Sequence, residues 1–254
     1  KRTRLRPRSI PAVSTTAMSS NFSMKGIFCR MKLPYDTLLF DLDGTIIDSA
    51  PGVFASLRPA FAAVGLPEPS EALLRRFIGP PLAESFETYC YLDGEKISEA
   101  IRVFRSHYEV DGKLLCSAYP GLERLFVRLK QAGKRLFVAT SKPEVFAREI
   151  MANLGLASYF DGIYGADLSE RVEKWEVLAR LIMENTGIDR EHAVMIGDRK
   201  YDVVGAARCG LDCIGILYGF GDRTEFEAAG AKYITETVES LEELLLPPQR
   251  RKSM

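Results

Sequence analysis

The 254-residue sequence predicts an α/β fold, in which a doubly wound, Rossmann-like parallel sheet carries an inserted helical region. From residue 119 to residue 246, short apolar runs typical of buried strands alternate with stretches typical of helices. A further apolar run at 35–40 precedes a stretch, 51–118, in which we find no convincing strand. We therefore expect residues 35–50 and 119–246 to form an α/β core and residues 51–118 to form a helical insertion.

Glycine and proline residues mark the helices of the helical insertion. The first helix begins near Pro51, ends at Gly65-Leu66-Pro67, and repeats apolar residues at helical spacing: Val53, Leu57, Phe61 and Val64. Further helices are expected at 70–77, 82–91 and 95–108.

In the core, helices and short strands follow one another along the chain. We expect strands at 35–40, 135–139, 160–164, 193–196 and 213–217. Helices are expected at 121–131, 143–154, 173–186, 200–209 and 240–246. Such alternation predicts a parallel sheet that is covered by helices on both faces.

The composition excludes several classes of protein. Hydrophobic residues at 46% and charged residues at 27% are ordinary for a globular chain, and no apolar run approaches the ~20 residues that span a bilayer. Residues 1–35 hold eight of the 34 basic residues and none of the 34 acidic ones. The rest of the chain therefore has 26 basic against 34 acidic residues, a net charge of −8. We expect neither a nucleic-acid nor a membrane partner.

The cysteines and histidines carry no site of their own. An odd number of scattered cysteines indicates free thiols in a reducing compartment, here the cytoplasm: Cys29, Cys90, Cys116, Cys209 and Cys213. Cys209 and Cys213 have neither a second pair nor a neighbouring histidine, which argues against zinc. His107 and His192 are the only histidines, and neither lies near a pattern that suggests a nucleophile.

The two ends of the chain are expected to lie outside the fold. Residues 1–34 are rich in Arg, Ser and Thr and contain no acid, so they predict a disordered leader, and residues 247–254 predict a flexible tail. A transit peptide, which would place the protein in an organelle, and a nucleic-acid-binding arm are the alternatives for the leader. Because the sequence starts with Lys1, we favour an artefactual or dispensable leader.

The segment Asp41-Leu42-Asp43-Gly44-Thr45 places two carboxylates at the end of the first predicted strand. Open α/β sheets bind their ligands at such strand ends. Asp41 and Asp43 would share a face if the strand continued, and their charges repel unless a cation or a proton joins them. Gly44 permits a sharp bend through which backbone amides can approach an anion.

Polar residues also follow other predicted strands. Thr140-Ser141-Lys142-Pro143 offers hydroxyls at a helix start, which is either an anion-binding corner or a simple N-cap. Asp198 follows Gly197 at a strand end, and Asp202 lies in the first turn of the next helix, where an acid alone would offset the helix dipole. Lys174 opens another helix within reach of the same edge. Carboxylates gathered in this way require a cation such as Mg²⁺, and a cation, a lysine and amides are what phosphoryl transfer needs.

These motifs resemble those of the haloacid dehalogenase (HAD) superfamily of hydrolases. Four motifs match in the family's order: 41–45, Thr140-Ser141, Lys174, and Gly197-Asp198 with Asp202. The match spans about residues 35–246, and the helical insertion resembles the family's small α-helical cap of C1 type. Residues 75–82 together with 197–202 look most like the phosphoglycolate phosphatase and 5′-nucleotidase-like branch.

The resemblance implies an Mg²⁺-dependent phosphatase that acts on small phosphate monoesters. Asp41 would attack phosphorus to form a phosphoaspartyl intermediate, Asp43 would act as general acid and then base, and Lys174 would balance charge. Phosphate binding is implied for Gly44, Thr45, Thr140, Ser141 and Lys174. Binding of Mg²⁺ is implied for Asp41, Asp43 (by its backbone carbonyl), Asp198 and Asp202.

Other functions fit parts of the same pattern. A phosphosugar mutase of the same fold would pass the phosphoryl group to a sugar, and a receiver-like module would hold it on an aspartate without catalysis. The presence of Asp43 argues against a dehalogenase and against a receiver. Phosphoglycolate, a nucleoside monophosphate, a phosphosugar and pyrophosphate all remain open as substrates, and we expect a monomer or a weak homodimer.

Overall fold

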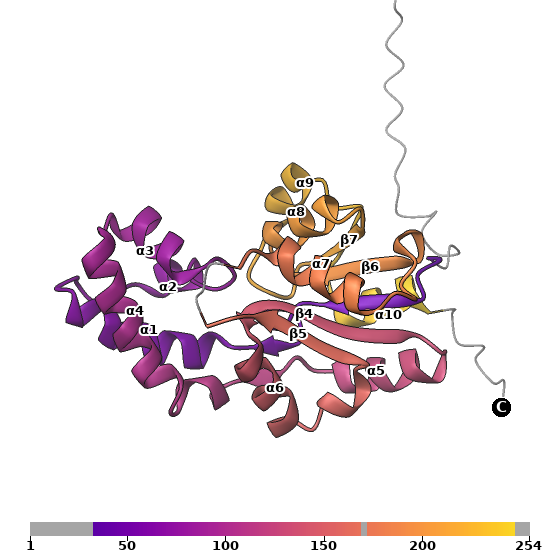
Figure 1. The fold of residues 1–254 in the computed structure, drawn as a ribbon, viewed down its shortest axis with the longest axis horizontal. Coiled ribbons are helices and arrows are strands. Elements are labelled where there is room, and N and C mark those ends of the chain that lie inside the picture. The colour runs from indigo at the N-terminus through magenta and orange to yellow at the C-terminus, as the bar shows by residue number, and fades with distance from the viewer. Residues whose placement is uncertain (1–32, 169–171, 247–254) are drawn as a thin grey trace, which may run out of the picture. The chain divides into compact units, whose positions relative to one another are not determined.

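The computed structural model describes residues 33–168 and 172–246, and it confirms the α/β fold class (Figure 1). The described residues form a six-stranded sheet in the order β5-β4-β1-β6-β7-β8, in which all neighbouring strands are parallel. Its strands are β1 (Thr37–Phe40), β4 (Arg135–Pro143), β5 (Gly162–Ala166), β6 (Ala193–Gly197), β7 (Asp212–Ile216) and β8 (Tyr233–Thr235).

The strand order reverses at β1, which makes the sheet doubly wound. The chain moves from β1 to β4 and β5 on one side, and β6, β7 and β8 follow on the other side. Phe40, the last residue of β1, is in register with Val138 of β4 and Ile196 of β6. Strands β1 and β6 therefore end at nearly the same level, at the reversal point where such sheets bind ligands, and β4 continues past them to Pro143.

Helices cover both faces of the sheet (Figure 1). One face packs against α5 (Leu122–Gln131), α6 (Glu144–Asn153) and α10 (Val238–Leu245). The other packs against α7 (Lys174–Glu184), α8 (Lys200–Arg208) and α9 (Arg223–Ala229). Short 3₁₀ helices lie at η3 (Gly112–Leu114), η4 (Ala157–Tyr159) and η5 (Arg190–His192).

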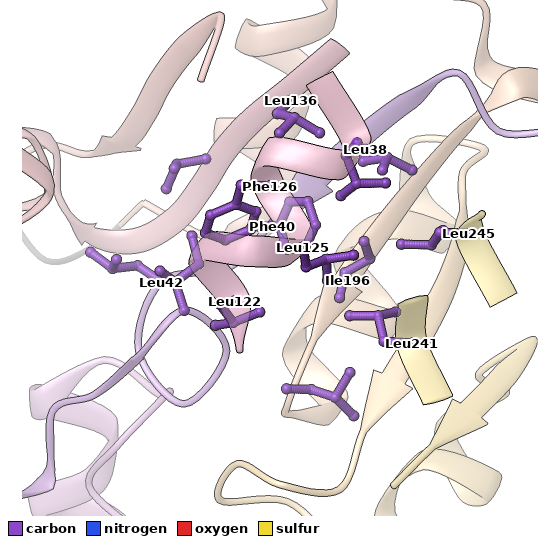
Figure 2. Packing of buried hydrophobic residues seen from close by; sticks show 14 of the residues in the cluster. Leu38, Phe40, Leu42, Leu122, Leu125, Phe126, Leu136, Ile196, Leu241 and Leu245 are labelled. Carbon is purple, nitrogen blue, oxygen red and sulfur yellow. The ribbon is translucent and has the colours of Figure 1, made fainter. Parts of the chain in front are cut away.

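The central strand supplies side chains to both hydrophobic clusters. Leu38 and Phe40 point into the first cluster, where Figure 2 shows Phe40 beside Phe126 of α5, with ring centroids 5.4 Å apart. Leu39 points into the second cluster. Because successive residues of β1 are buried on opposite faces, Leu38, Leu39 and Phe40 form an uninterrupted apolar run instead of alternating with polar residues.

The helical insertion has a hydrophobic cluster of its own. Its helices are α1 (Ala50–Ala63), α2 (Glu71–Arg75), α3 (Leu82–Cys90) and α4 (Gly94–Tyr108). The rings of Phe61, Phe77 and Phe86 contact one another at centroid distances of 4.9–5.6 Å. Ser70 and Asp93 cap α2 and α4 by accepting hydrogen bonds from backbone amides, which explains where these helices begin.

The structure corrects several expectations. A two-residue strand, β3 (Ser117–Ala118), pairs antiparallel with β2 (Ile47–Asp48), so the expectation of no strand within 51–118 is wrong at its end. Leu33 is buried in the first cluster, and its amide donates to the carbonyl of Leu244, so the predicted leader of residues 1–34 extends too far. The rest of that leader and the tail at 247–254 lie outside the described residues. Strand β8 and helix α9 were not expected. Among the described residues, no helix combines the length and apolarity needed to cross a bilayer.

Candidate active site

Asp41 lies at the carboxyl end of β1, where it contacts a buried lysine. Its Oδ1 atom accepts a hydrogen bond from the Leu42 amide at 2.7 Å and lies 2.7 Å from Nζ of Lys174. Lys174, the first residue of α7, also lies 2.9 Å from Oδ1 of Asp202 and donates to the Ala139 carbonyl at 3.0 Å. One ammonium group thus joins two carboxylates, one at the end of β1 and one in the first turn of α8.

Three carboxylates meet at this edge of the sheet. Single oxygens of Asp41, Asp198 and Asp202 all lie within 4.8 Å of one another, and all three residues are buried. Asp198 accepts hydrogen bonds from the Phe220 amide at 2.8 Å and from the Thr45 hydroxyl at 3.4 Å. Oxygen ligands of this kind fit Mg²⁺, and a divalent cation would offset the two negative charges that Lys174 leaves unbalanced.

Burial and mutual repulsion perturb the charges of this cluster. Burial raises the pKa of Asp41 to about 7, with Lys174 opposing and Asp202 adding to the shift. Burial, together with Asp202 and Asp41, raises the pKa of Asp198 well above its usual range. Burial alone would lower the pKa of Lys174, but Asp202 and Asp41 raise it, so the ammonium remains charged. The three carboxylates therefore favour partners that bring positive charge.

Two glycines let the chain approach these carboxylates closely. Gly44 has φ +75°, and a Cβ atom there would lie 2.0 Å from Oδ2 of Asp198. A Cβ atom on Gly197 would lie 2.2 Å from Cγ of Asp202. No other residue type fits either position without moving a carboxylate of the cluster.

Asp43 is held apart from the three-carboxylate cluster. Its Oδ1 atom forms an ion pair with Nζ of Lys142 at 3.0 Å. The same ammonium donates to the Tyr108 hydroxyl, at the end of α4, at 2.5 Å. Strand β1 ends at Phe40, so the side chains of Asp41 and Asp43 meet different lysines. The implied contact of the Asp43 carbonyl with Mg²⁺ stays a prediction.

Thr140 and Ser141 lie within the neighbouring strand β4, near its carboxyl end, and reach the same site. Strand β4 continues to Pro143, and neither hydroxyl caps α6, so the N-cap alternative is wrong. The Thr140 hydroxyl is buried and accepts a hydrogen bond from the Lys142 amide at 3.2 Å. Both residues line a cavity of about 110 Å³ together with Asp41 and Asp43.

Of the residues implied for phosphate binding, Gly44, Thr45 and Lys174 are not among those that line this cavity. The Gly44 amide donates to the Ile47 carbonyl, and the Thr45 hydroxyl donates to Asp198. These hydrogen bonds shape the turn after β1 and support the carboxylate cluster. Their role in phosphate binding remains a prediction.

The helical insertion forms the apolar side of the cavity. Its contribution is largely aromatic and aliphatic: Val53, Phe77, Ile78, Pro80, Pro81, Leu82, Phe104 and Tyr108. Arg199, next to Asp198, donates hydrogen bonds to the Ile78 carbonyl and, at 3.0 Å, to Glu225. It therefore connects the segment between α2 and α3 to the core.

Sequence reasoning assigned no role to Lys142, Tyr108 or Arg199. Lys142 lies two residues after Thr140 near a strand end, and Arg199 lies between the predicted ligands Asp198 and Asp202. Their positions in the sequence could therefore have indicated a place in the site. The contact of Tyr108 with Lys142 depends on how the helical insertion packs, which local patterns do not predict.

Comparison with known proteins agrees with this geometry. The family model described as "Haloacid dehalogenase-like hydrolase" matches residues 38–216. A 5′-nucleotidase of Pseudomonas aeruginosa is 39% identical over 214 residues, which cover 84% of this chain and 96% of that protein. The tyrosine-protein kinase PtkA of Mycobacterium tuberculosis is 36% identical over 211 residues, 82% of this chain and 72% of that protein. A phosphoglycolate phosphatase of Vibrio cholerae is 28% identical over 217 residues, 82% of this chain and 96% of that protein.

Solved structures show the same architecture. The crystal structure of a "predicted phosphatase" from Clostridium acetobutylicum matches with a TM-score of 0.78 and 40% identity, covering 82% of this chain and 97% of that one. The matched residues include most of β1, all of β4 and β6, and the motif residues Asp41, Lys174 and Asp198. This chain belongs to the haloacid dehalogenase-like hydrolases, as its strand-end motifs predict.

Proposed function

We propose that this protein is an Mg²⁺-dependent phosphatase that hydrolyses small phosphate monoesters through a phosphoaspartyl intermediate. The observation that carries the proposal is the position of Asp41. Its carboxylate lies at the end of the central strand, 2.7 Å from Lys174, and lines the cavity with Thr140 and Ser141. A nucleophilic carboxylate, a neighbouring cation and hydroxyl groups are the components of phosphoryl transfer. The phosphatase and nucleotidase relatives support this reading.

The reaction would proceed in two displacements. A carboxylate oxygen of Asp41 attacks phosphorus, the bond to the ester oxygen breaks, and Asp43 passes a proton to that oxygen. Water then attacks phosphorus, gives its proton to Asp43, and releases phosphate and free Asp41. Thr140 and Ser141 hold phosphoryl oxygens, while Lys174 balances negative charge on Asp41 and the phosphoryl group.

Magnesium would be held by Asp41, Asp198 and Asp202, with the Asp43 carbonyl as a further ligand. When bound, it would supply positive charge that draws the phosphoryl group toward Asp41. Three buried carboxylates opposite a single lysine fit such an ion, because the cluster otherwise keeps uncompensated charge.

The cavity supports a small substrate. Its volume of about 110 Å³ lies well below the roughly 300–1,000 Å³ of pockets that bury drug-sized ligands. Phosphoglycolate and a nucleoside monophosphate are the two substrates that the relatives support, and a nucleoside would require the insertion to move outward. Transfer to a sugar or, by analogy with the kinase relative, to a protein hydroxyl is the alternative outcome.

Phosphate release by purified protein tests the proposal. With p-nitrophenyl phosphate and Mg²⁺, Asp41→Asn should lower kcat at least about a thousandfold, because an amide is no nucleophile. Asp189→Asn serves as the control, because Asp189 is an exposed acid that precedes β6 in the sequence and does not belong to the carboxylate cluster. EDTA should stop the reaction and Mg²⁺ should restore it.

A panel with phosphoglycolate, nucleoside monophosphates, phosphosugars and pyrophosphate then identifies the substrate. Residual activity of Asp41→Asn above one tenth of the wild-type rate, or activity that survives EDTA, would reject the mechanism. Consumption of substrate without release of inorganic phosphate would indicate transfer in place of hydrolysis.

A further inference from the structure

A chain of three polar side chains, the buried Tyr108 and the largely buried Lys142 and Asp43, connects the helical insertion to the turn after β1. The Tyr108 hydroxyl accepts a hydrogen bond from Nζ of Lys142 at 2.5 Å, and the same nitrogen lies 3.0 Å from Oδ1 of Asp43. The Lys142 side chain is 8% exposed and that of Asp43 is 12% exposed. Tyr108 belongs to α4, Lys142 to β4, and Asp43 to the turn after β1.

Aromatic packing fixes the Tyr108 ring at the boundary between insertion and core. The ring stacks on Phe104 of α4 with centroids 5.1 Å apart and planes 14° apart. It also meets Phe146 of α6 edge-on at 6.0 Å. With a rigid ring, the hydroxyl has a defined position, so it can determine where the flexible Lys142 side chain places its ammonium.

Lys142 and Tyr108 both keep their protons. Burial alone would lower the pKa of Lys142, but Asp43 and Tyr108 raise it above its usual value. Burial raises the pKa of Tyr108 to about 12, so its hydroxyl keeps its proton. The ammonium therefore contacts Asp43 as a fixed positive charge.

We propose that Lys142 and Tyr108 are positioning residues, which hold the Asp43 carboxyl group where it exchanges a proton with the leaving oxygen. Lys142 contacts Oδ1, which leaves Oδ2 as the oxygen that carries the proton. Because Tyr108 comes from the helical insertion, this arrangement is complete only when α4 is seated against α6. The inference rests on the proposed function of Asp43.

Its consequence is a dependence on the leaving group. A positioned general acid contributes about 10²–10⁴ in rate, and it matters most when the departing oxygen is strongly basic. A shift of about 1 Å in a catalytic group can cost about a hundredfold. Loss of the positioning contact should therefore slow phenyl phosphate much more than p-nitrophenyl phosphate, although the two substrates have nearly the same shape.

The test compares kcat and KM for these two substrates in Tyr108→Phe, which removes one hydroxyl and keeps the ring. We expect kcat to fall at least tenfold for phenyl phosphate and less than threefold for p-nitrophenyl phosphate. Lys142→Met should show a larger difference in the same direction, and Lys142→Arg should recover part of it. Tyr89→Phe, a tyrosine of the same insertion that packs on Phe77, is the matched control. Thermal unfolding confirms that each variant is folded.

Equal loss of kcat for both substrates would overturn the inference. A rise in KM alone would also overturn it and would make Lys142 a substrate-binding residue. Asp43→Asn, measured in parallel, separates the two hypotheses. If Asp43→Asn slows phenyl phosphate selectively and Tyr108→Phe does not, only the positioning role fails. If Asp43→Asn slows both substrates equally, the role of Asp43 as general acid fails, and the positioning role of Lys142 and Tyr108 fails with it. Asp41→Asn still tests the proposed nucleophile independently.

Discussion

Replacing Lys174 by methionine should destabilise the protein strongly, because the lysine lies between two buried carboxylates. Its ammonium is 2.7 Å from Asp41 and 2.9 Å from Asp202, and the residue is only 6% exposed. At an effective dielectric constant of ~20, each contact corresponds to about 6 kcal/mol of attraction. Desolvation of the charges takes back several kcal/mol per ion, so the net cost of removing one partner is about 3–5 kcal/mol.

Urea unfolding followed by circular dichroism, in EDTA at pH 7.5, measures this loss for Lys174→Met. For a chain of this size, a loss of 3–5 kcal/mol corresponds to a decrease in Tm of about 6–20 °C. Excess Mg²⁺ should recover part of it, since a bound cation supplies the missing positive charge and stabilises the native state. The double variant Lys174→Met with Asp202→Asn should also recover part, because it removes one of the unpaired carboxylates.

A loss below about 1 kcal/mol would refute the reasoning, because it would mean that Lys174 does not neutralise buried charge. The reasoning would fail equally if neither Mg²⁺ nor Asp202→Asn restored any stability to Lys174→Met.

Two further predictions concern the surroundings of the site. Gly44→Ala would place a methyl group 2.0 Å from Oδ2 of Asp198, at a residue with positive φ. The substitution should abolish phosphatase activity and the increase in Tm that Mg²⁺ causes. A Tm increase as large as that of the wild type would contradict this prediction. Glu144 accepts hydrogen bonds from Arg148, Arg180 and the Gly165 amide, and although burial opposes them, these bonds lower its pKa below 4.5. Ionised Glu144 therefore stabilises the folded protein above pH 4.5, and this contribution is lost as the pH falls through the lower folded-state pKa. Glu144→Gln should cost about 1 kcal/mol near pH 7, and its Tm should converge with that of the wild type in acid; a constant difference from pH 7 to pH 3 would disprove the link.

The sequence alone predicts the sheet and the main residues of the site, because both follow from local patterns. Buried parallel strands are nearly continuous apolar runs, and the ligand site lies at their carboxyl ends regardless of loop length and sequence. Asp41, Lys174 and Asp198 could therefore be placed together before their contacts were known. The two-residue strands β2 and β3 escaped notice because they are too short for any periodicity to appear.

The direction of Asp43 could not be predicted in the same way. The rule that residues two apart share a face holds only within a strand, and β1 ends at Phe40, before either acid. After Phe40, the conformation of the backbone turn determines where each side chain points, and it directs Asp43 toward Lys142, ninety-nine positions further along the sequence. A contact of that separation depends on how β4 and α4 pack, which no local pattern contains.

The pairing of β2 with β3 has a consequence for protein engineering. Ile47 pairs with Ala118, and Asp48 pairs with Ser117, so the chain leaves and re-enters the core at one place. Paired strands are about 4.8 Å apart, a gap that two or three residues can bridge. Residues 49–116 could thus be excised or exchanged for a foreign module with a very short linker, while the scaffold that carries Asp41 keeps its connectivity.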